Sequence, residues 1–516
     1  MDPISMNSFN TSNLLRISGL ASGMDTESMV KQLMKAASIP LDKLNQQKQF
    51  YQWQQEDLRD INTKLLSLRN NDVFNLRMQG TFMSKAVSSS NSSVATATAG
   101  ANALNGIYNI EVSQLASAAY RTSNDLTNII TDPDLALNQS GEIVLNNTLN
   151  KTTITIDSSD SLNSIITKIN NSEAGVNATY DKNLNRIFFM SKTTGSTQRI
   201  DFTGTDVNGQ QILNNYMNMG IKFSTDGLYT DTNAATGKDA LFYLNNDKTI
   251  QYKESTNSFS LLGINITLNS IGTTTLSVST DNDKIFNSIK SFVDNYNEVI
   301  TQINTKLTQK RYYDYQPLTD DQKQAMKDND IKLWEEKARS GDLSNSSTLT
   351  RVYYSLRDTV SSLVSGVSNG SLSAIGITTG LWNEGGKLYI DETKLRNAIS
   401  NNPQFVSDIF TKTSTTTDSS GNTVIVSQGI AQKLYDSLKT GIDAITREAG
   451  SSTLLYDTSF IGDKIKNINS RIFDMQDYLK NLEKRYYDQF TQLETYLGKM
   501  NSQSAWLSQQ LGSMTK

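Results

Sequence analysis

Residues 461–487, IGDKIKNINSRIFDMQDYLKNLEKRYY, decide the fold that we expect for this chain. Their apolar side chains recur at alternating steps of four and three, which is the spacing of a helical seam. The pattern continues in the same frame to Leu507 without a proline, over about six heptads, a length specific for a coiled coil. We therefore predict a C-terminal coiled coil within residues 451–516. Its seam residues are Ile465, Ile468, Ile472, Met475, Leu479, Leu482, Tyr486 and Leu493.

A second seam lies near the other end of the chain. Asp25 is a good cap for an amphipathic helix at residues 26–37, and Pro40 is tolerated in the first turn of a second helix that covers about 41–70. Because both ends carry seams and polar sequence lies between them, we expect the chain to fold back with its ends together. The seam residues of the second helix are Leu41, Leu44, Tyr51, Leu58 and Leu65.

Such seams need partners. About a dozen seam residues contribute roughly 1.5–3 kcal/mol each when fully buried. Fixing about 50 residues costs on the order of 1–2 kcal/mol each in backbone entropy, which helix formation offsets only in part. We therefore predict that the seam residues form an oligomerisation surface, that neighbouring chains complete it, and that isolated monomers have frayed ends.

The middle of the chain changes from strand patterns to helical ones. Residues 106–116 alternate apolar and polar side chains as a half-buried strand does, and residues 161–171 form an embedded helix. Further on, a hairpin is expected to turn at residues 384–386. The fold class that follows is α+β multidomain, with terminal α-helical coiled-coil legs, a helical domain and inserted β-rich head domains.

We divide the chain into five segments on this basis. They are a flexible N-terminal assembly and export segment (1–40), the N-terminal helix of the leg domain (41–75), a β-rich head region of two small domains (76–280), a helical domain with a hairpin (281–450) and the C-terminal coiled coil (451–516).

Length and composition exclude most kinds of enzyme. The chain has 516 residues, a hydrophobic fraction of 37%, a formal net charge of -4, and neither cysteine nor histidine. The missing residue types rule out disulfides, thiolate nucleophiles, most zinc sites and histidine-dependent triads. No basic stripe could follow nucleic-acid phosphates, and no apolar run approaches the roughly 20 residues of a membrane span. We expect no nucleic-acid partner, no membrane insertion, no metal and no cofactor.

Carboxylate pairs remain the one route to hydrolysis. The pairs Glu335–Glu336 and Asp320–Asp321 are the right chemical type for a general acid and base. Both fall among lysines and glutamines in a predicted helix at 317–340, where a solvated face is their ordinary role. We therefore predict a structural protein, and an extracellular glycosidase stays open as an alternative.

Several stretches resemble the flagellar filament-cap family (FliD, or hook-associated proteins). The specific ones are RISGLASGMDTE at 16–27 and WEEKARSG at 334–341. FVDNYN at 292–297 is similar to the C-terminal region of that family, and residues 161–195 resemble a repeat found in flagellins, hook-associated proteins and caps. The likeness spans about residues 16–511, and the departure from it is at 1–5, which precede a second methionine, Met6, and are consistent with an expression leader.

The resemblance implies a function that the residue patterns do not supply. Caps of this family form a homo-oligomeric ring at the distal tip of the filament, keep exported flagellin from leaking away and promote its insertion. They are secreted through the flagellar export system, which implies an export chaperone and an extracellular location, and they use no catalytic residue, metal or cofactor. The alternatives are a hook–filament junction protein, a flagellin, or a flagellin-like surface adhesin that binds a host glycan through the β-rich middle.

Overall fold

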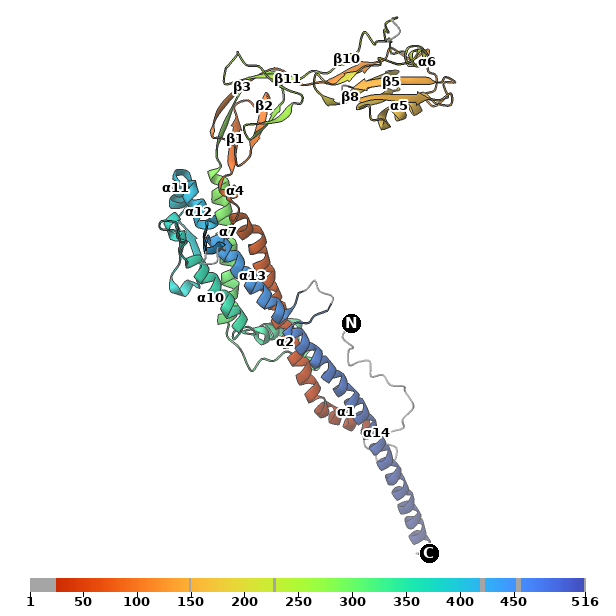
Figure 1. Ribbon diagram of the computed structural model, residues 1–516. Coiled ribbons are helices and arrows are strands. Elements are labelled where there is room, and N and C mark those ends of the chain that lie inside the picture. The colour runs from red at the N-terminus through yellow and green to blue at the C-terminus, as the bar shows by residue number, and fades with distance from the viewer. Residues whose placement is uncertain (1–24, 148–149, 226–228, 418–422, 452–455, 515–516) are drawn as a thin grey trace. The chain divides into compact units, whose positions relative to one another are not determined.

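The computed structural model describes residues 25–147, 150–225, 229–417, 423–451 and 456–514. The chain divides into two compact units. One, here called the helical unit, combines the chain up to Gln79 with the chain from Phe286 onward, and the other, the strand unit, comprises Gly80–Ile285. Figure 1 shows helices in the first and mostly strands in the second. The predicted fold class, α+β with several domains, is confirmed.

The first helices of the helical unit begin at the expected caps. Helix α1 (Thr26–Ala37) has the predicted bounds, and the Asp25 carboxylate accepts a hydrogen bond from the Ser28 amide at 3.0 Å. Helix α2 (Ile39–Ser67) has Pro40 in its first turn. The prediction that this helix continues to residue 70 is corrected, because the chain becomes a π-helix at Leu68–Val73 before α3 (Phe74–Leu76) and α4 (Gln79–Phe82).

Three longer helices form the core of the helical unit with α2. These are α7 (Asn282–Thr308), α10 (Ser347–Ser361) and α13 (Ile430–Ala449). Helix α13 packs against both α2 and α10. Gly441 allows the close approach to α10, since a Cβ atom there would lie 3.0 Å from a methyl group of Val352.

The segment after α7 differs from the prediction. Residues 317–340 were expected to form one helix, but the structure has α8 (Asp320–Ala325) and α9 (Asp328–Arg339). Met326 and Lys327 are extended, and Asp328 and Asp330 start a new first turn, where acidic side chains favour a helix N-terminus. No proline or glycine marks this break.

Short elements connect the remaining helices. The predicted hairpin is confirmed as β16 (Ile377–Thr379) paired with β17 (Leu388–Ile390), with a 3₁₀ turn at Trp382–Glu384 between them and another at Leu372–Ile375 before them. Helices α11 (Glu392–Asn401) and α12 (Pro403–Thr411) follow, then a second hairpin of β18 (Thr413–Thr417) and β19 (Thr423–Gln428). The last element is α14 (Phe460–Met514), 55 residues long.

The strand unit contains two separate hydrophobic clusters. The first lies under a five-stranded sheet and a three-stranded sheet and includes Ile110, Phe242 and Ile266. The sheet orders are β1-β15-β3-β11-β12 and β13-β14-β2. The strands are β1 (Lys85–Ser89), β2 (Ala95–Ala99), β3 (Gly106–Gln114), β11 (Ala240–Leu244), β12 (Tyr252–Glu254), β13 (Ser258–Leu261), β14 (Ile264–Leu268) and β15 (Gly272–Thr280).

The second cluster is centred on one amphipathic helix. Helix α5 (Leu162–Asn171) begins at a capping box formed by Ser161 and Ser164, and it buries Ile165 and Ile169. The other elements are β4 (Ala118–Thr122), β5 (Gly141–Asn147), β6 (Asn150–Ile156), β7 (Val176–Asp181), β8 (Arg186–Thr194), β9 (Arg199–Ile200), α6 (Val207–Gln211), a π-helix at Ile212–Tyr216 and β10 (Ala235–Thr236). The alternating burial predicted for residues 106–116 is confirmed in β3.

Candidate assembly surface

An apolar seam joins the N-terminal helices to α14. Leu41 and Leu44 of α2 are buried in one cluster with four side chains of α14. Met34, Ala37 and Tyr51 pack against it from the N-terminal side, as do Met475 and Tyr486 from α14. The heptad spacing explains this arrangement, because it brings one seam residue to the same face of the helix at each turn. The four buried residues of α14 are Ile468, Ile472, Leu479 and Leu482.

Polar contacts show that α2 and α14 run antiparallel. Near the start of α14, a guanidinium nitrogen of Arg59 lies 2.7 Å from a carboxylate oxygen of Asp457. Further along the chain, within α14, the Lys464 ammonium lies 4.9 Å from the ring centroid of Tyr51. Residue numbers therefore fall along α2 as they rise along α14. Helix α1 continues this pairing, since it also contacts α14.

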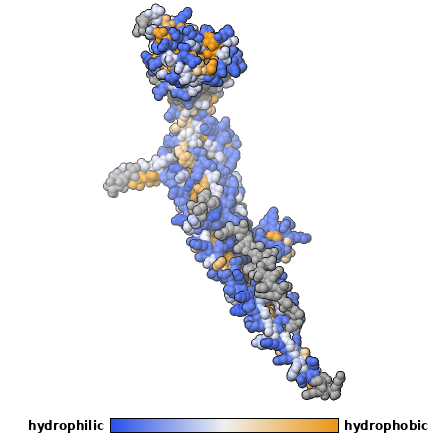
Figure 2. Space-filling view, turned by 90° about the vertical axis from the view of Figure 1, so that its right-hand side faces the viewer, coloured by the Kyte–Doolittle hydropathy of each residue, from blue (hydrophilic) through white to orange (hydrophobic). Residues whose placement is uncertain are grey.

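The seam continues along α14 beyond its buried part. Leu493 has 49% of its surface exposed, and three further apolar residues in the same heptad frame are exposed more strongly. They are Tyr496, Met500 and Leu507. We call these four residues the distal seam face. Figure 2 shows a surface that is largely hydrophilic, with scattered hydrophobic patches.

The predicted seam residues therefore fall into four groups. Most of them meet in the cluster described above, and Leu493 belongs to the distal seam face. Leu58 and Leu65 are fully buried, but they lie where α2 packs against α13, beside the hydrogen bond from Asn62 to the Thr446 hydroxyl at 3.0 Å. Ile465 is half-buried outside the cluster. Their assignment to oligomerisation stays a prediction, and the part of the N-terminal motif at 16–24 and the proposed leader at 1–5 lie outside the described residues.

A charged cluster attaches the segment after α7 to α2. No sequence pattern predicted this cluster. Asp57 of α2 forms ion pairs with Lys306 of α7 and with Arg339 of α9, the latter at 2.6 Å. The Lys306 ammonium also lies 3.5 Å from Asp342, whose side chain is fully buried. Hydrogen bonds from Gln46 to the Pro317 carbonyl and from Gln54 to the Asp342 carbonyl add to this attachment.

The two carboxylates of the cluster have opposite pKa shifts. Burial raises the pKa of Asp342 to about 7, and the nearby Asp57 carboxylate adds to the effect. Burial also opposes ionisation of Asp57, but hydrogen bonds, led by the one from Arg339, lower its pKa below the ordinary value. Asp342 therefore carries a proton at mildly acidic pH, while Asp57 is ionised. Nothing in the sequence pattern points to this pair, because it joins residues 285 positions apart (342 minus 57).

Comparisons with known proteins agree with this architecture. The family model described as flagellar hook-associated protein 2 C-terminus matches residues 237–502, and the corresponding N-terminus model matches 22–119. The chain belongs to the flagellar hook-associated protein 2 family. A third model, the flagellin hook IN motif, matches residues 142–193, which overlap the stretch at 161–195 that resembles a flagellin repeat.

Individual members of the hook-associated protein 2 family align along nearly the whole chain. The protein from Halalkalibacterium halodurans is 30% identical and the alignment covers 96% of this chain and 99% of the relative. The protein from Escherichia coli K12 is 27% identical over 95% of this chain and 97% of the relative. The predicted family is confirmed, and the chain is a structural component of the flagellum.

A solved structure shares the fold. The crystal structure titled as the D1-D2-D3 domains of the flagellar cap protein FliD from Escherichia coli superposes with a TM-score of 0.56. It is 22% identical in sequence, and the match covers 80% of this chain and 99% of that chain. At this sequence identity, the likeness shows only that the two chains share a fold.

Proposed function

We propose that this chain caps the distal tip of the bacterial flagellar filament as a homo-oligomeric ring, retains exported flagellin and promotes its insertion. Membership of the hook-associated protein 2 family supports a structural role in the flagellum. The observation that carries the proposal is the distal seam face, because an apolar heptad face on a long helix is suited to packing among the helices of neighbouring subunits.

The surroundings of the two acidic pairs that were candidates for a general acid and base fit a non-enzymatic role. Glu335 forms an ion pair with Lys323 at 2.8 Å, and Glu336 is exposed on α9. Asp320 and Asp321 occupy the first turn of α8, where they stabilise its N-terminus. In the described ranges, no three acidic side chains gather in a way that could hold a metal ion.

The proposed partners follow from the same surface. The distal seam face would pack against flagellin or further copies of this chain in the assembled filament. Before export, an export chaperone would keep that face from water. Of the helices that the structure describes, none is both long and apolar enough to cross a bilayer. We propose a secreted, extracellular location, and host-glycan binding by the strand unit as an additional role.

A complementation experiment tests the cap proposal. A strain lacking its own copy of this gene is given either the wild-type chain or a variant with Leu493→Ser and Met500→Ser. The wild type is expected to give long filaments and little flagellin in the medium, whereas the variant should give stub filaments and leaked flagellin. Normal filaments in the strain without any copy would end the proposal.

Electron microscopy of the purified chain separates the structural alternatives. A cap is expected to form small closed rings or stacked plates, because a closed symmetric assembly has a fixed number of copies. Extended filaments would instead indicate a flagellin. Separately, failure of full-length chain to bind mucin or glycan would remove the adhesin role and leave the cap proposal intact.

A further inference from the structure

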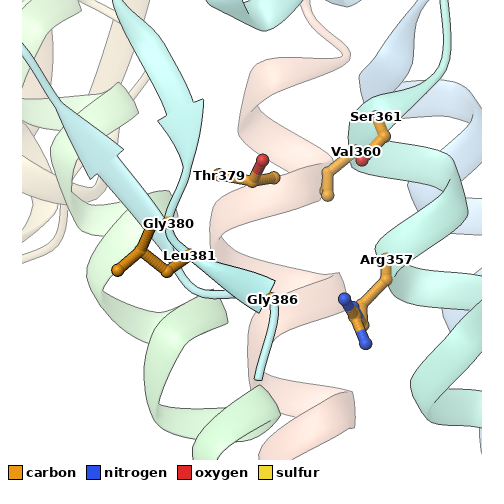
Figure 3. A pocket seen from close by; sticks show the side chains of 7 residues that line it. All are labelled: Arg357, Val360, Ser361, Thr379, Gly380, Leu381 and Gly386. Carbon is orange, nitrogen blue, oxygen red and sulfur yellow. The ribbon is translucent and has the colours of Figure 1, made fainter. Parts of the chain in front are cut away.

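A pocket in the helical unit lies apart from the seam. It has a volume of about 270 Å3 and opens between α10 and the β16–β17 hairpin. Figure 3 shows Arg357 and Ser361 of α10 on one side and the hairpin on the other. The hairpin contributes Thr379, Gly380, Leu381 and Gly386. None of these residues belongs to α1, α2 or α14.

The Arg357 side chain is held in a fixed position. Its stem lies directly on the backbone of Gly386, where a Cβ atom would come within 2.5 Å of Nε. Gly386 has a φ angle of 83°, a conformation that also favours glycine. One terminal nitrogen of Arg357 donates to the Tyr353 hydroxyl at 3.3 Å, and that hydroxyl donates to the Gly385 carbonyl at 2.8 Å. The guanidinium is therefore ordered before any ligand arrives.

This guanidinium has no counter-ion among the described residues. The one hydrogen bond that it makes there goes to Tyr353, although an arginine has five N–H donors. The hairpin carboxylate nearest in sequence, Glu384, is already engaged by the Leu381 amide at 2.6 Å and by the Tyr389 hydroxyl at 3.1 Å. A half-buried, pre-ordered arginine with spare donors is suited to a planar, two-oxygen anion.

The rim of the pocket indicates the source of that anion. Leu381, which lines the pocket, is 69% exposed. A small free anion would leave this side chain in water. A protein segment could cover it with an apolar residue while its carboxylate reaches Arg357. Interfaces are built in this way around aromatic and arginine anchors.

We propose that this pocket binds an aspartate or glutamate side chain of another protein chain, next to an apolar residue of the same segment. The carboxylate pairs with the Arg357 guanidinium, the Ser361 and Thr379 hydroxyls stand at the pocket wall, and the apolar neighbour covers Leu381. This proposal does not depend on the cap function.

A pair of short peptides tests the proposal on the full chain. The probes are N-acetyl-leucyl-glutamate amide and its neutral match, N-acetyl-leucyl-glutamine amide, and binding is followed by saturation-transfer NMR. The glutamate peptide is expected to bind at least about tenfold more tightly, the effect of one charge-assisted contact. Arg357→Gln should abolish that preference. Arg351→Gln, which removes the same charge from an exposed position of α10, should keep it.

Three results would overturn the proposal. They are equal binding of the two peptides, an undiminished preference in Arg357→Gln, and inorganic phosphate binding as tightly as the glutamate peptide, which would indicate a site for free anions. Circular dichroism checks that Arg357→Gln is folded. If it is not, Arg357→Lys keeps the charge and loses the fork-shaped donor set, and an unchanged preference in that variant would contradict the proposal equally.

Discussion

Replacing Leu479 by alanine should loosen the internal seam and leave the rest of the molecule intact. Leu479 is 7% exposed and packs in the cluster formed by α2 and α14. Burying a leucine completely is worth roughly 1.5–3 kcal/mol, and truncating it in a core costs about 2–5 kcal/mol. Only two or three helices form this seam, so solvent lies close to Leu479. We therefore expect the substitution to lower the free energy of opening the seam by about 2–3 kcal/mol, near the lower end of that range.

Hydrogen exchange is the suitable assay, because it reports local opening in a chain whose two units need not unfold together. A loss of about 2.7 kcal/mol corresponds to roughly hundredfold faster exchange, at 1.36 kcal/mol for each factor of ten. This acceleration should appear in peptides from residues 465–486 and 39–51. Peptides from α10 and α13 should exchange as in the wild type.

Leu493→Ala is the matched control. It removes the same atoms from the same helix and heptad frame, but Leu493 is half exposed, so exchange in the dilute monomer should change by less than about threefold. Equal effects of the two variants on residues 465–486 would refute the division of α14 into a buried seam and a distal seam face. So would no effect of Leu479→Ala at all.

Three further predictions concern other features. In thermal unfolding, the stability of Asp342→Asn relative to the wild type should rise as pH increases from 5 to 8. The raised pKa of Asp342 gives the wild type a stabilising contribution that is lost as pH rises toward about 7. A difference between variant and wild type that does not change with pH would contradict this. Gly441→Leu should cost about 1–3 kcal/mol by forcing α13 away from Val352, and unchanged denaturant unfolding would refute the close approach. Asp25→Ala should cost α1 about 1 kcal/mol, seen as faster exchange in residues 26–37 but not in α13, and equal exchange would show that the cap contributes nothing.

Helix ends could be predicted where a capping residue or a glycine marks them in the sequence. Asp25 caps the start of α1, as predicted, and Gly450, with its positive φ angle, follows the end of α13 at Ala449. The break between α8 and α9 escaped prediction because neither glycine nor proline marks it. The heptad pattern predicted which face of α2 is apolar but not which helices pack against it. Leu44 packs against α14, whereas Leu58 lies where α2 meets α13.

The charged cluster and the pocket could not be predicted from the sequence. Asp57, Lys306 and Asp342 come from three separate parts of the chain, and each alone is an ordinary helical or loop residue. Arg357 is likewise one of many cations until the hairpin places Gly386 against it. Patterns within a helix report which face is buried, but contacts between distant segments depend on how the helices pack.

Crosslinking tests most directly whether the distal seam face contacts another protein chain in assembled flagella. A photoreactive phenylalanine analogue placed at Tyr496 is compared with the same analogue at Lys480, an exposed position on the part of α14 that packs against the N-terminal helices. We expect crosslinks from position 496 to another protein chain in flagella and none in the dilute monomer. Crosslinks only within the same chain, or equal yields from both positions, would contradict this expectation.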